Sequence, residues 1–153
     1  MKKIALSVVF ALASITAFAQ ELTFEKTTHN FQNIEYAGDG TYKFKFTNTG
    51  DQPLIITKSK GSCGCTVPIW PKEPIMPGES AEIKVKYDTK RPGNFQKTVT
   101  VTSNSTKGKV IPNDTSGQTT TRLTIKGVVA PKPTPAEQQL QTQPSSPMMP
   151  KAN

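Results

Sequence analysis

The clearest structural signal in this chain is Thr41-Tyr42-Lys43-Phe44-Lys45-Phe46-Thr47. Its three aromatic residues occupy alternate positions, and two lysines fill the positions between them. Because successive side chains of a β-strand point to opposite faces, this pattern predicts a strand with one buried and one solvated face. Such a strand is typical of an antiparallel sheet that packs its aromatic side onto a core.

The segments on either side of residues 41–47 repeat this pattern, and residues that favour turns separate them. We expect further strands at residues 22–25, 29–34, 53–57, 81–87, 95–102 and 122–129. No amphipathic helix pattern is found between residues 20 and 130. Short strands joined by Gly, Pro and Asn turns are typical of two packed antiparallel sheets. The sequence therefore predicts an all-β protein, an immunoglobulin-like β-sandwich of about seven antiparallel strands.

Several local features add detail to this expectation. Residues 67–74 contain three prolines, which a central strand does not accommodate, so we expect an extended connection there. Gly127 shifts the alternation of the last strand and predicts a β-bulge in it. Lys97 breaks an apolar face, which places it near a strand end. Residues 103–120 are polar without periodicity and predict a long loop, with a small hairpin at residues 109–111.

The chain begins with the three-part layout of a secretory signal peptide. A basic Met1-Lys2-Lys3 precedes an apolar run at residues 4–18, and a small-residue cleavage motif ends at Ala19. We expect cleavage between Ala19 and Gln20, which removes residues 1–19. The alternative is a retained anchor helix, for which the apolar run is short. The signal predicts a periplasmic or secreted protein that has no membrane span after cleavage.

The rest of the chain divides into one domain and a tail. Residues 20–130 are long enough for a single two-sheet core. Residues 131–153 hold six of the thirteen prolines, several glutamines and no aromatic residue. Such a composition cannot bury enough apolar surface to fold, so we expect a disordered or polyproline-like extension.

The charge of the chain argues against some classes of partner. The net charge is +8, and loss of Lys2 and Lys3 would leave +6. The remaining lysines are spread along the predicted strands, as at Lys43, Lys45, Lys84 and Lys86. Without a patch of interleaved basic and aromatic residues, nucleic acid is not an expected partner of an exported protein. A loose affinity for acidic polymers or lipid head groups stays open.

The only two cysteines, Cys63 and Cys65, are one residue apart on a bend that contains Gly61 and Gly64. An exported protein meets an oxidising environment, so the two cysteines could be oxidised to a disulfide. A disulfide between them is one hypothesis, since Gly64 permits a bend that brings the two residues within range. The closed ring would be small, and its entropic stabilisation would be less than that of a long loop.

Three other hypotheses stay open for this pair. Thiol–disulfide exchange would use an exposed, labile disulfide, although no helix N-terminus is there to lower a thiolate pKa. A soft-metal site for Cu(I) or zinc would need more ligands, and His29 and a methionine are the candidates. The last hypothesis is two free thiols, Cys63 and Cys65, without a special role.

The sequence shows no constellation of catalytic residues. It lacks a Ser-His-Asp context, a close pair of carboxylates on a rigid element and a phosphate-binding loop. We therefore expect no enzyme and no resident cofactor. The predicted function is an exported, non-catalytic binding or adaptor module of the cell envelope that contacts a protein partner. The alternative is a thiol-redox or copper-handling protein that uses Cys63-Gly64-Cys65.

The order of the motifs resembles that of a known family. The matching segments are Phe31 with Ile34, Phe46–Leu54, Ser62–Thr66, Pro77–Glu79, Gly93–Phe95 and Ile125–Val128. This order is similar to the bacterial secreted family called domain of unknown function fifteen-seventy-three, which is related to immunoglobulin-like domains of the Hydin and major sperm protein type. The resemblance covers residues 22–129 and implies the sandwich and the export, but no reaction. Asn30 and Gln32 depart from it, where that family would have Asp and Gly.

Overall fold

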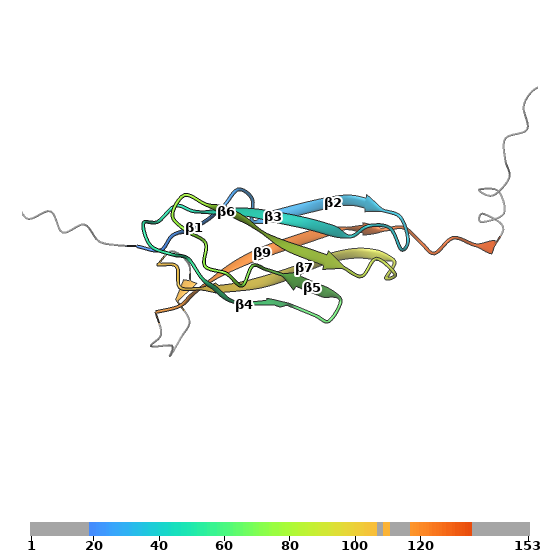
Figure 1. Cartoon of the computed structure of the whole chain (residues 1–153). Coiled ribbons are helices and arrows are strands. Elements are labelled where there is room, and N and C mark those ends of the chain that lie inside the picture. The colour runs from blue at the N-terminus through green and yellow to red at the C-terminus, as the bar shows by residue number, and fades with distance from the viewer. Residues whose placement is uncertain (1–18, 107–108, 111–116, 136–153) are drawn as a thin grey trace, which may run out of the picture.

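The computed structural model describes residues 19–106, 109–110 and 117–135 and forms a sandwich of two sheets. Nine strands occur in these residues: β1 (Leu22–Phe24), β2 (Thr28–Ile34), β3 (Thr41–Asn48), β4 (Ile56–Gly61), β5 (Thr66–Ile69), β6 (Ser80–Tyr87), β7 (Gly93–Ser103), β8 (Lys109–Val110) and β9 (Thr119–Val129). One sheet has the order β1-β3-β6-β5, and the other has the order β2-β9-β7-β4 with β8 paired to β9. The sheets pack face to face (Figure 1), which confirms the predicted all-β, immunoglobulin-like sandwich.

The core lies between the two inner faces and follows the predicted alternation. Apart from Leu54, its most buried apolar side chains come from the central strands, and each is at most 1% exposed: Phe44, Phe46, Ile83, Val85, Val99, Val101, Leu123, Ile125 and Val129. Each such side chain stabilises the fold by about 1.5–3 kcal/mol relative to an exposed one. The lysines between the aromatic residues of β3 are exposed, as the period-two pattern requires.

The prediction of about seven antiparallel strands misses one feature of the sheets. β2 pairs with β9 in parallel, whereas every other strand pair of the described residues is antiparallel. Residues 25–27 carry the chain from β1 in one sheet to β2 in the other. β2 therefore meets the last strand as a distant neighbour, and no hairpin forces the two strands to run in opposite directions.

The predicted β-bulge exists, but it lies in β2 and not in the last strand. β9 pairs with β7 in continuous register through Gly127. In β2 the register jumps between Asn30 and Asn33, so Phe31 and Gln32 share one position opposite Gly127. An added Cβ on Gly127 would lie 3.1 Å from both the Gln32 carbonyl oxygen and the Phe31 Cβ. The glycine thus leaves room for the bulge of its partner strand.

Two predicted strand limits were wrong. The strand expected at residues 53–57 begins at Ile56 and ends at Gly61. Leu54 instead forms an isolated bridge with Ile75, and its side chain is fully buried. Lys97 lies near the middle of β7, opposite Ile125, and is partly buried; the prediction of a strand end there was wrong because β7 extends to Gly93.

Residues 67–74 contain a strand where a connection was expected. β5 is an edge strand of its sheet and holds Pro68 at its third position. Proline is tolerated at a sheet edge because its missing N–H then faces away from the neighbouring strand. The small hairpin expected at residues 109–111 is present as the pairing of β8 with Thr119 and Thr120.

The predicted signal peptide and tail fall mostly outside the described residues. Within them, the Ala19 N–H donates to Asp51 Oδ1 (2.7 Å), and the Gln20 carbonyl accepts from the Thr106 N–H (2.7 Å). Cleavage between Ala19 and Gln20 would remove the first contact and keep the second, and it stays a prediction. In the part of the chain that the structure describes, no helix has the length and apolarity to cross a membrane.

His29 belongs to an aromatic cluster that joins the two sheets. Its ring stacks on Tyr42 of β3 at 3.5 Å between centroids and meets the edge of Phe31 at 4.5 Å. Burial lowers the pKa of His29 below its ordinary value of 6.5, and the nearby charge of Lys26 lowers it further. The folded protein therefore favours the neutral imidazole.

We expect the stability of the protein to fall as the pH drops below about 6.5, because the unfolded chain then binds a proton that the folded state resists. His29 is the only histidine, so His29→Phe should flatten the dependence between pH 7.5 and 5.5. Urea titrations of both proteins at the two pH values measure the change in the free energy of unfolding. A midpoint at or above 6.5 in an NMR titration of the His29 ring would contradict the argument.

Candidate functional site

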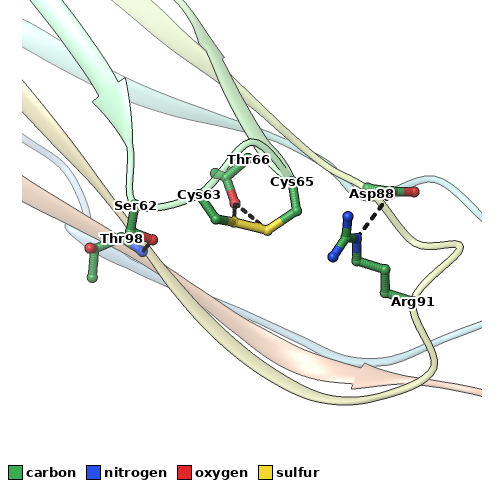
Figure 2. The surroundings of a disulfide bond; sticks show 7 residues. All are labelled: Ser62, Cys63, Cys65, Thr66, Asp88, Arg91 and Thr98. Carbon is green, nitrogen blue, oxygen red and sulfur yellow. Dashed lines mark hydrogen bonds and ion pairs between the residues drawn. A yellow bond between two sulfur atoms is a disulfide. The ribbon is translucent and has the colours of Figure 1, made fainter.

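The two cysteines lie on the link that carries the chain from β4 in one sheet to β5 in the other. The Ser62 N–H donates to the Thr98 carbonyl (2.8 Å), and the Thr98 N–H donates to Ser62 Oγ (3.1 Å), as Figure 2 shows in part. The Thr66 N–H donates to the Cys63 carbonyl (3.2 Å) and closes the turn. These bonds fix the corner of the sandwich to β7 on one side and to β5 on the other.

Cys63 and Cys65 lie close enough to bond and form a disulfide (Figure 2). Their Cα atoms are 5.2 Å apart. That separation falls inside the range of about 4.4–6.8 Å that disulfides accept. Cys65 is 7% exposed, whereas Cys63 is only partly buried. The structure therefore brings together the two residues that the sequence singled out, and it leaves Cys63 as the more accessible of the pair.

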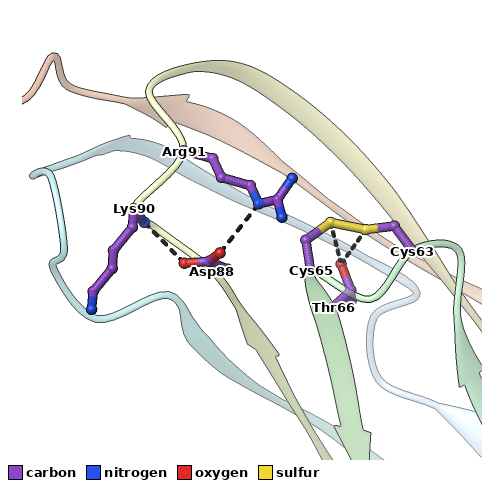
Figure 3. Close-up of polar contacts among 6 residues, drawn as sticks. All are labelled: Cys63, Cys65, Thr66, Asp88, Lys90 and Arg91. Carbon is purple, nitrogen blue, oxygen red and sulfur yellow. Dashed lines mark hydrogen bonds and ion pairs between the residues drawn. A yellow bond between two sulfur atoms is a disulfide. The ribbon is translucent and has the colours of Figure 1, made fainter.

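A hydroxyl group lies beside both sulfur atoms. Thr66 Oγ1 is 3.6 Å from the Cys63 sulfur and 3.8 Å from the Cys65 sulfur (Figures 2 and 3). The Thr66 side chain is buried, so little water competes for these contacts. A hydroxyl in this place can donate a hydrogen bond to a thiolate on either cysteine after reduction.

Asp88 and Arg91 hold the other side of the corner. The Asp88 N–H donates to the Cys65 carbonyl (2.9 Å), and its carboxylate accepts from Lys90 N–H and Arg91 Nε, each at 3.1 Å. The backbone N–H of Lys90 first, and then the Arg91 side chain, lower the pKa of Asp88. In Figures 2 and 3 the Arg91 guanidinium lies on the side of Asp88 that faces the disulfide.

The metal hypothesis gains no further ligand from the structure. His29 packs in the aromatic cluster between the sheets and does not join the cysteines. Among the described residues, no group of three or more His, Cys, Asp and Glu side chains is placed to hold a metal ion. Sulfur atoms joined in a disulfide are also not thiolates, so Cu(I) or zinc would require prior reduction. Copper or zinc binding stays a prediction.

A pocket of about 720 Å³ opens beside the disulfide. It is lined by the loop of residues 37–40, by Gly64, Cys65 and Val67, and by residues 86–90. Thr89 fixes its wall, because its hydroxyl donates to the Gly38 carbonyl (2.6 Å) and its own carbonyl accepts from the Ala37 N–H (3.1 Å). No sequence pattern indicated this pocket, since segments far apart in the chain form it.

An apolar and cationic patch continues from this pocket along β5 and β6. Val67 and Ile69 are 53% and 58% exposed. Their cross-strand partners are Lys86 and Lys84, respectively. The spacing of Val67 and Ile69 is the period-two signal of a strand with an apolar outer face, but the surrounding prolines argued for a connection. We call Val67, Ile69, Lys84 and Lys86 the β5–β6 patch.

The free edge of β5 offers no N–H group to another strand. The Asp88 N–H donates to the Cys65 carbonyl, so the backbone groups of Cys65 point toward β6. Because alternate residues of a strand direct their backbone groups to the same side, those of Val67 and Ile69 also point toward β6. Thr66 and Pro68 therefore face outward. The Thr66 N–H is already bonded to the Cys63 carbonyl, and Pro68 has none. The edge is thus protected against strand addition.

The two packed sheets and the bonded corner between them make this chain an immunoglobulin-like β-sandwich. The structure is similar to the ASH / PapD-like domain of human CEP192, with a TM-score of 0.58 and 7% identity over 86% of this chain and 100% of that one. By sequence, the model of the DUF1573 family, proteins of unknown function, matches residues 22–129. The chain belongs to this family, as its motif order predicted.

Two further solved structures share the fold. A protein of unknown function from Porphyromonas gingivalis W83 has a TM-score of 0.55 and 15% identity over 77% of this chain and 51% of that one. The VesB protease of Vibrio cholerae has a TM-score of 0.52 and 15% identity over 71% of this chain. The match spans only 32% of the protease. A search of curated protein sequences found no match.

Of the two glycines on the predicted bend, Gly61 is the one that the close approach of the backbone requires. An ideal Cβ on Gly61 would overlap the carbonyl oxygen of Thr66. Gly64 has no atom within 4 Å of such a Cβ and does not have a positive φ. The chain crosses between the sheets in so few residues that β4 and β5 touch at Gly61.

We expect Gly61→Ala to lower the free energy of unfolding by about 2–3 kcal/mol, because two backbone segments must separate to admit the methyl group. Gly64→Ala is the matched control and should change it by less than about 1 kcal/mol. Urea titration of both oxidised variants measures the difference. Equal losses in the two variants would show that the close approach at Gly61 is not a constraint.

Proposed function

We propose that this protein is a non-catalytic, protein-binding module of the bacterial cell envelope, exported to the periplasm or beyond. Its partner docks on the β5–β6 patch next to the disulfide corner. Membership of a family of unknown function and the PapD-like fold are consistent with a binding module. The proposal of a particular surface comes from the residues of this chain.

The exposure of Val67 and Ile69 is the observation that carries the proposal. Both side chains point outward from the same strand, since residues two apart share a face of a sheet. The described residues contain no other strand with two large apolar side chains more than half exposed. Adjacent apolar side chains on an outer face mark interaction sites, because their burial by a partner releases water.

The charges beside the patch indicate the chemistry of the partner. Lys84 and Lys86 flank the two apolar residues and form no ion pair within the described part of the chain, although the charges of both help to lower the pKa of the exposed Asp39. By contrast, Lys43 and Lys45 on the same sheet pair with Glu82 (2.9 Å) and Glu25 (2.8 Å). The patch therefore fits a partner segment that presents apolar side chains with acidic residues next to them.

The mode of binding follows from the protected edge of β5. Without an available N–H on that edge, a partner cannot extend the sheet by adding a strand. It must bind across the outer face through side chains. The pocket beside Val67 can accept one of them, because it is open next to the patch and reaches Cys65.

Removal of the two apolar side chains should abolish binding. We expect Val67→Ser with Ile69→Ser to reduce recovery of the partner about 10-fold or more, since two interface anchors are lost. The readout is mild crosslinking and pull-down of the full chain from the envelope fraction. Ile55→Ser with Val128→Ser is the matched control, because both residues are 39% exposed elsewhere on the surface.

Recovery of the same partner with both variants would show that the patch is not the docking site. Failure to recover any partner with the unchanged protein would overturn the proposed function itself.

A second candidate function is thiol–disulfide exchange at Cys63 and Cys65. Two observations favour it: the Thr66 hydroxyl lies beside both sulfurs, and in Figure 3 the Arg91 guanidinium lies on the side of Asp88 that faces the disulfide. In the first step, a thiolate of a dithiol reductant attacks the Cys63 sulfur, and the electron pair of the broken bond leaves on the Cys65 sulfur. The second thiolate of the reductant then releases Cys63, which leaves the reductant oxidised and this chain as a dithiol.

Mass spectrometry of the intact exported protein tests this candidate. We expect a gain of about two daltons with a dithiol reductant, and Thr66→Val should slow the reduction about 10-fold because the leaving thiolate loses its hydrogen bond. Cys63→Ser is the control and should show no mass change. Equal reduction rates with and without the Thr66 hydroxyl would sink the exchange hypothesis, as would an unchanged mass.

A further inference from the structure

The five-stranded sheet contains no acidic residue. None of the strands β2, β4, β7, β8 and β9 includes an Asp or a Glu. Among the residues of this sheet whose burial is described, the exposed cations are Lys58, Lys60, Arg122 and Lys126. All four are exposed, and none has an ion pair among the described residues. The opposite sheet differs, because Glu25 and Glu82 neutralise two of its lysines.

The strand register places these cations in rows with hydroxyl and amide groups. One row across β4, β7 and β9 is Lys60–Thr100–Arg122. A second row across β7, β9 and β2 is Gln96–Lys126–Asn30. Between them lies the hydroxyl row Thr98–Thr124–Thr28. Strands in a sheet lie about 4.8 Å apart, so Lys60 and Arg122 stand about 10 Å apart with a hydroxyl between them.

Three hollows on this face follow the rows. The first, of about 500 Å³, is lined by Lys58, Lys60, Ser62 and a group of threonines. The second, of about 270 Å³, is lined by Thr100, Thr120, Thr121 and Arg122. The third, of about 540 Å³, is lined by Asn30, Gln96, Lys126 and their neighbours. Each hollow combines hydroxyl or amide groups with at least one cation, and none includes a carboxylate.

The chemistry of the face excludes several kinds of partner. The aromatic residues of these strands, Phe31 and Phe95, pack against the core, so bases have no ring on which to stack. Among the residues of these strands whose exposure is described, Val128 is the only large apolar side chain that is more than a third exposed, which gives neither a protein interface core nor an anchor in lipid. Cations among hydroxyl and amide groups instead match a polymer that carries both negative charges and hydroxyl groups.

We propose that the outer face of the five-stranded sheet binds a linear acidic polysaccharide, one with carboxylate groups on its sugars. Lys58, Lys60, Arg122 and Lys126 attract the carboxylates, and the threonine and amide rows exchange hydrogen bonds with the sugar hydroxyls. This face is opposite to the β5–β6 patch, so the proposal does not depend on the proposed protein partner. Both together would let the module hold a protein near an acidic glycan.

The test uses the full exported chain and polygalacturonate as the probe, with affinity measured at several salt concentrations. We expect Lys60→Gln with Arg122→Gln to weaken binding about 10-fold at low salt and to reduce the salt slope by about two. Lys84→Gln with Lys86→Gln is the matched control, since it removes the same charge from the opposite sheet. The control should retain affinity within about twofold, because those lysines do not touch the polymer.

Equal losses in the two variants would mean that net charge alone attracts the polymer, and this would overturn the proposal. The same holds if polyglutamate, duplex DNA or vesicles of anionic phospholipid bind as tightly as polygalacturonate. Dextran, a neutral polysaccharide, should not bind. Because this assay contains no protein partner, a negative result would concern polysaccharide binding alone. A negative pull-down would concern only the protein partner of the β5–β6 patch.

Discussion

The contact between the two inner faces of the sandwich is the constraint on which the other features depend. Phe44 and Phe46 of one sheet, with Val99 and Leu123 of the other, are almost completely removed from solvent. A slip of any central strand by one residue would turn this apolar set outward and bring lysines into the core. The packing therefore fixes the register of every central strand, and with it the composition of both outer faces.

The corner at Gly61 follows from the same constraint. The chain must leave β4 in one sheet and enter β5 in the other within residues 62–65, so the two backbones come together at Gly61 and Thr66. The disulfide lies on this short link. A bond between residues two apart restricts the unfolded chain less than a long loop does, so its entropic contribution to stability is modest. Its place beside a pocket and an apolar patch is what connects it to function.

The two outer faces of the sandwich have different charge patterns. On the four-stranded sheet, Lys43 and Lys45 are paired with glutamates. The exposed cations of the five-stranded sheet have no ion pair among the described residues. Exposed ion pairs stabilise a fold by at most about 1 kcal/mol each, so the difference says little about stability. It matters for recognition, because unpaired cations in a fixed array attract anions of matching spacing. The β5–β6 patch and the outer face of the five-stranded sheet are thus suited to different partners.

Alternating apolar and polar residues in β3 and β6 were enough to predict the sandwich and most of its core, since a strand's two faces are set by neighbouring residues. The motif order also predicted the family, and the Cys63–Gly64–Cys65 spacing pointed to the candidate site. The tertiary structure alone decided that β5 is a strand, that the bulge opposite Gly127 lies in β2 and that β2 runs parallel to β9. It also decided which cations share a face. These features depend on close approaches between segments far apart in the chain, and local patterns did not decide them: in β5 the alternation of Val67 and Ile69 was outweighed by the prolines around it.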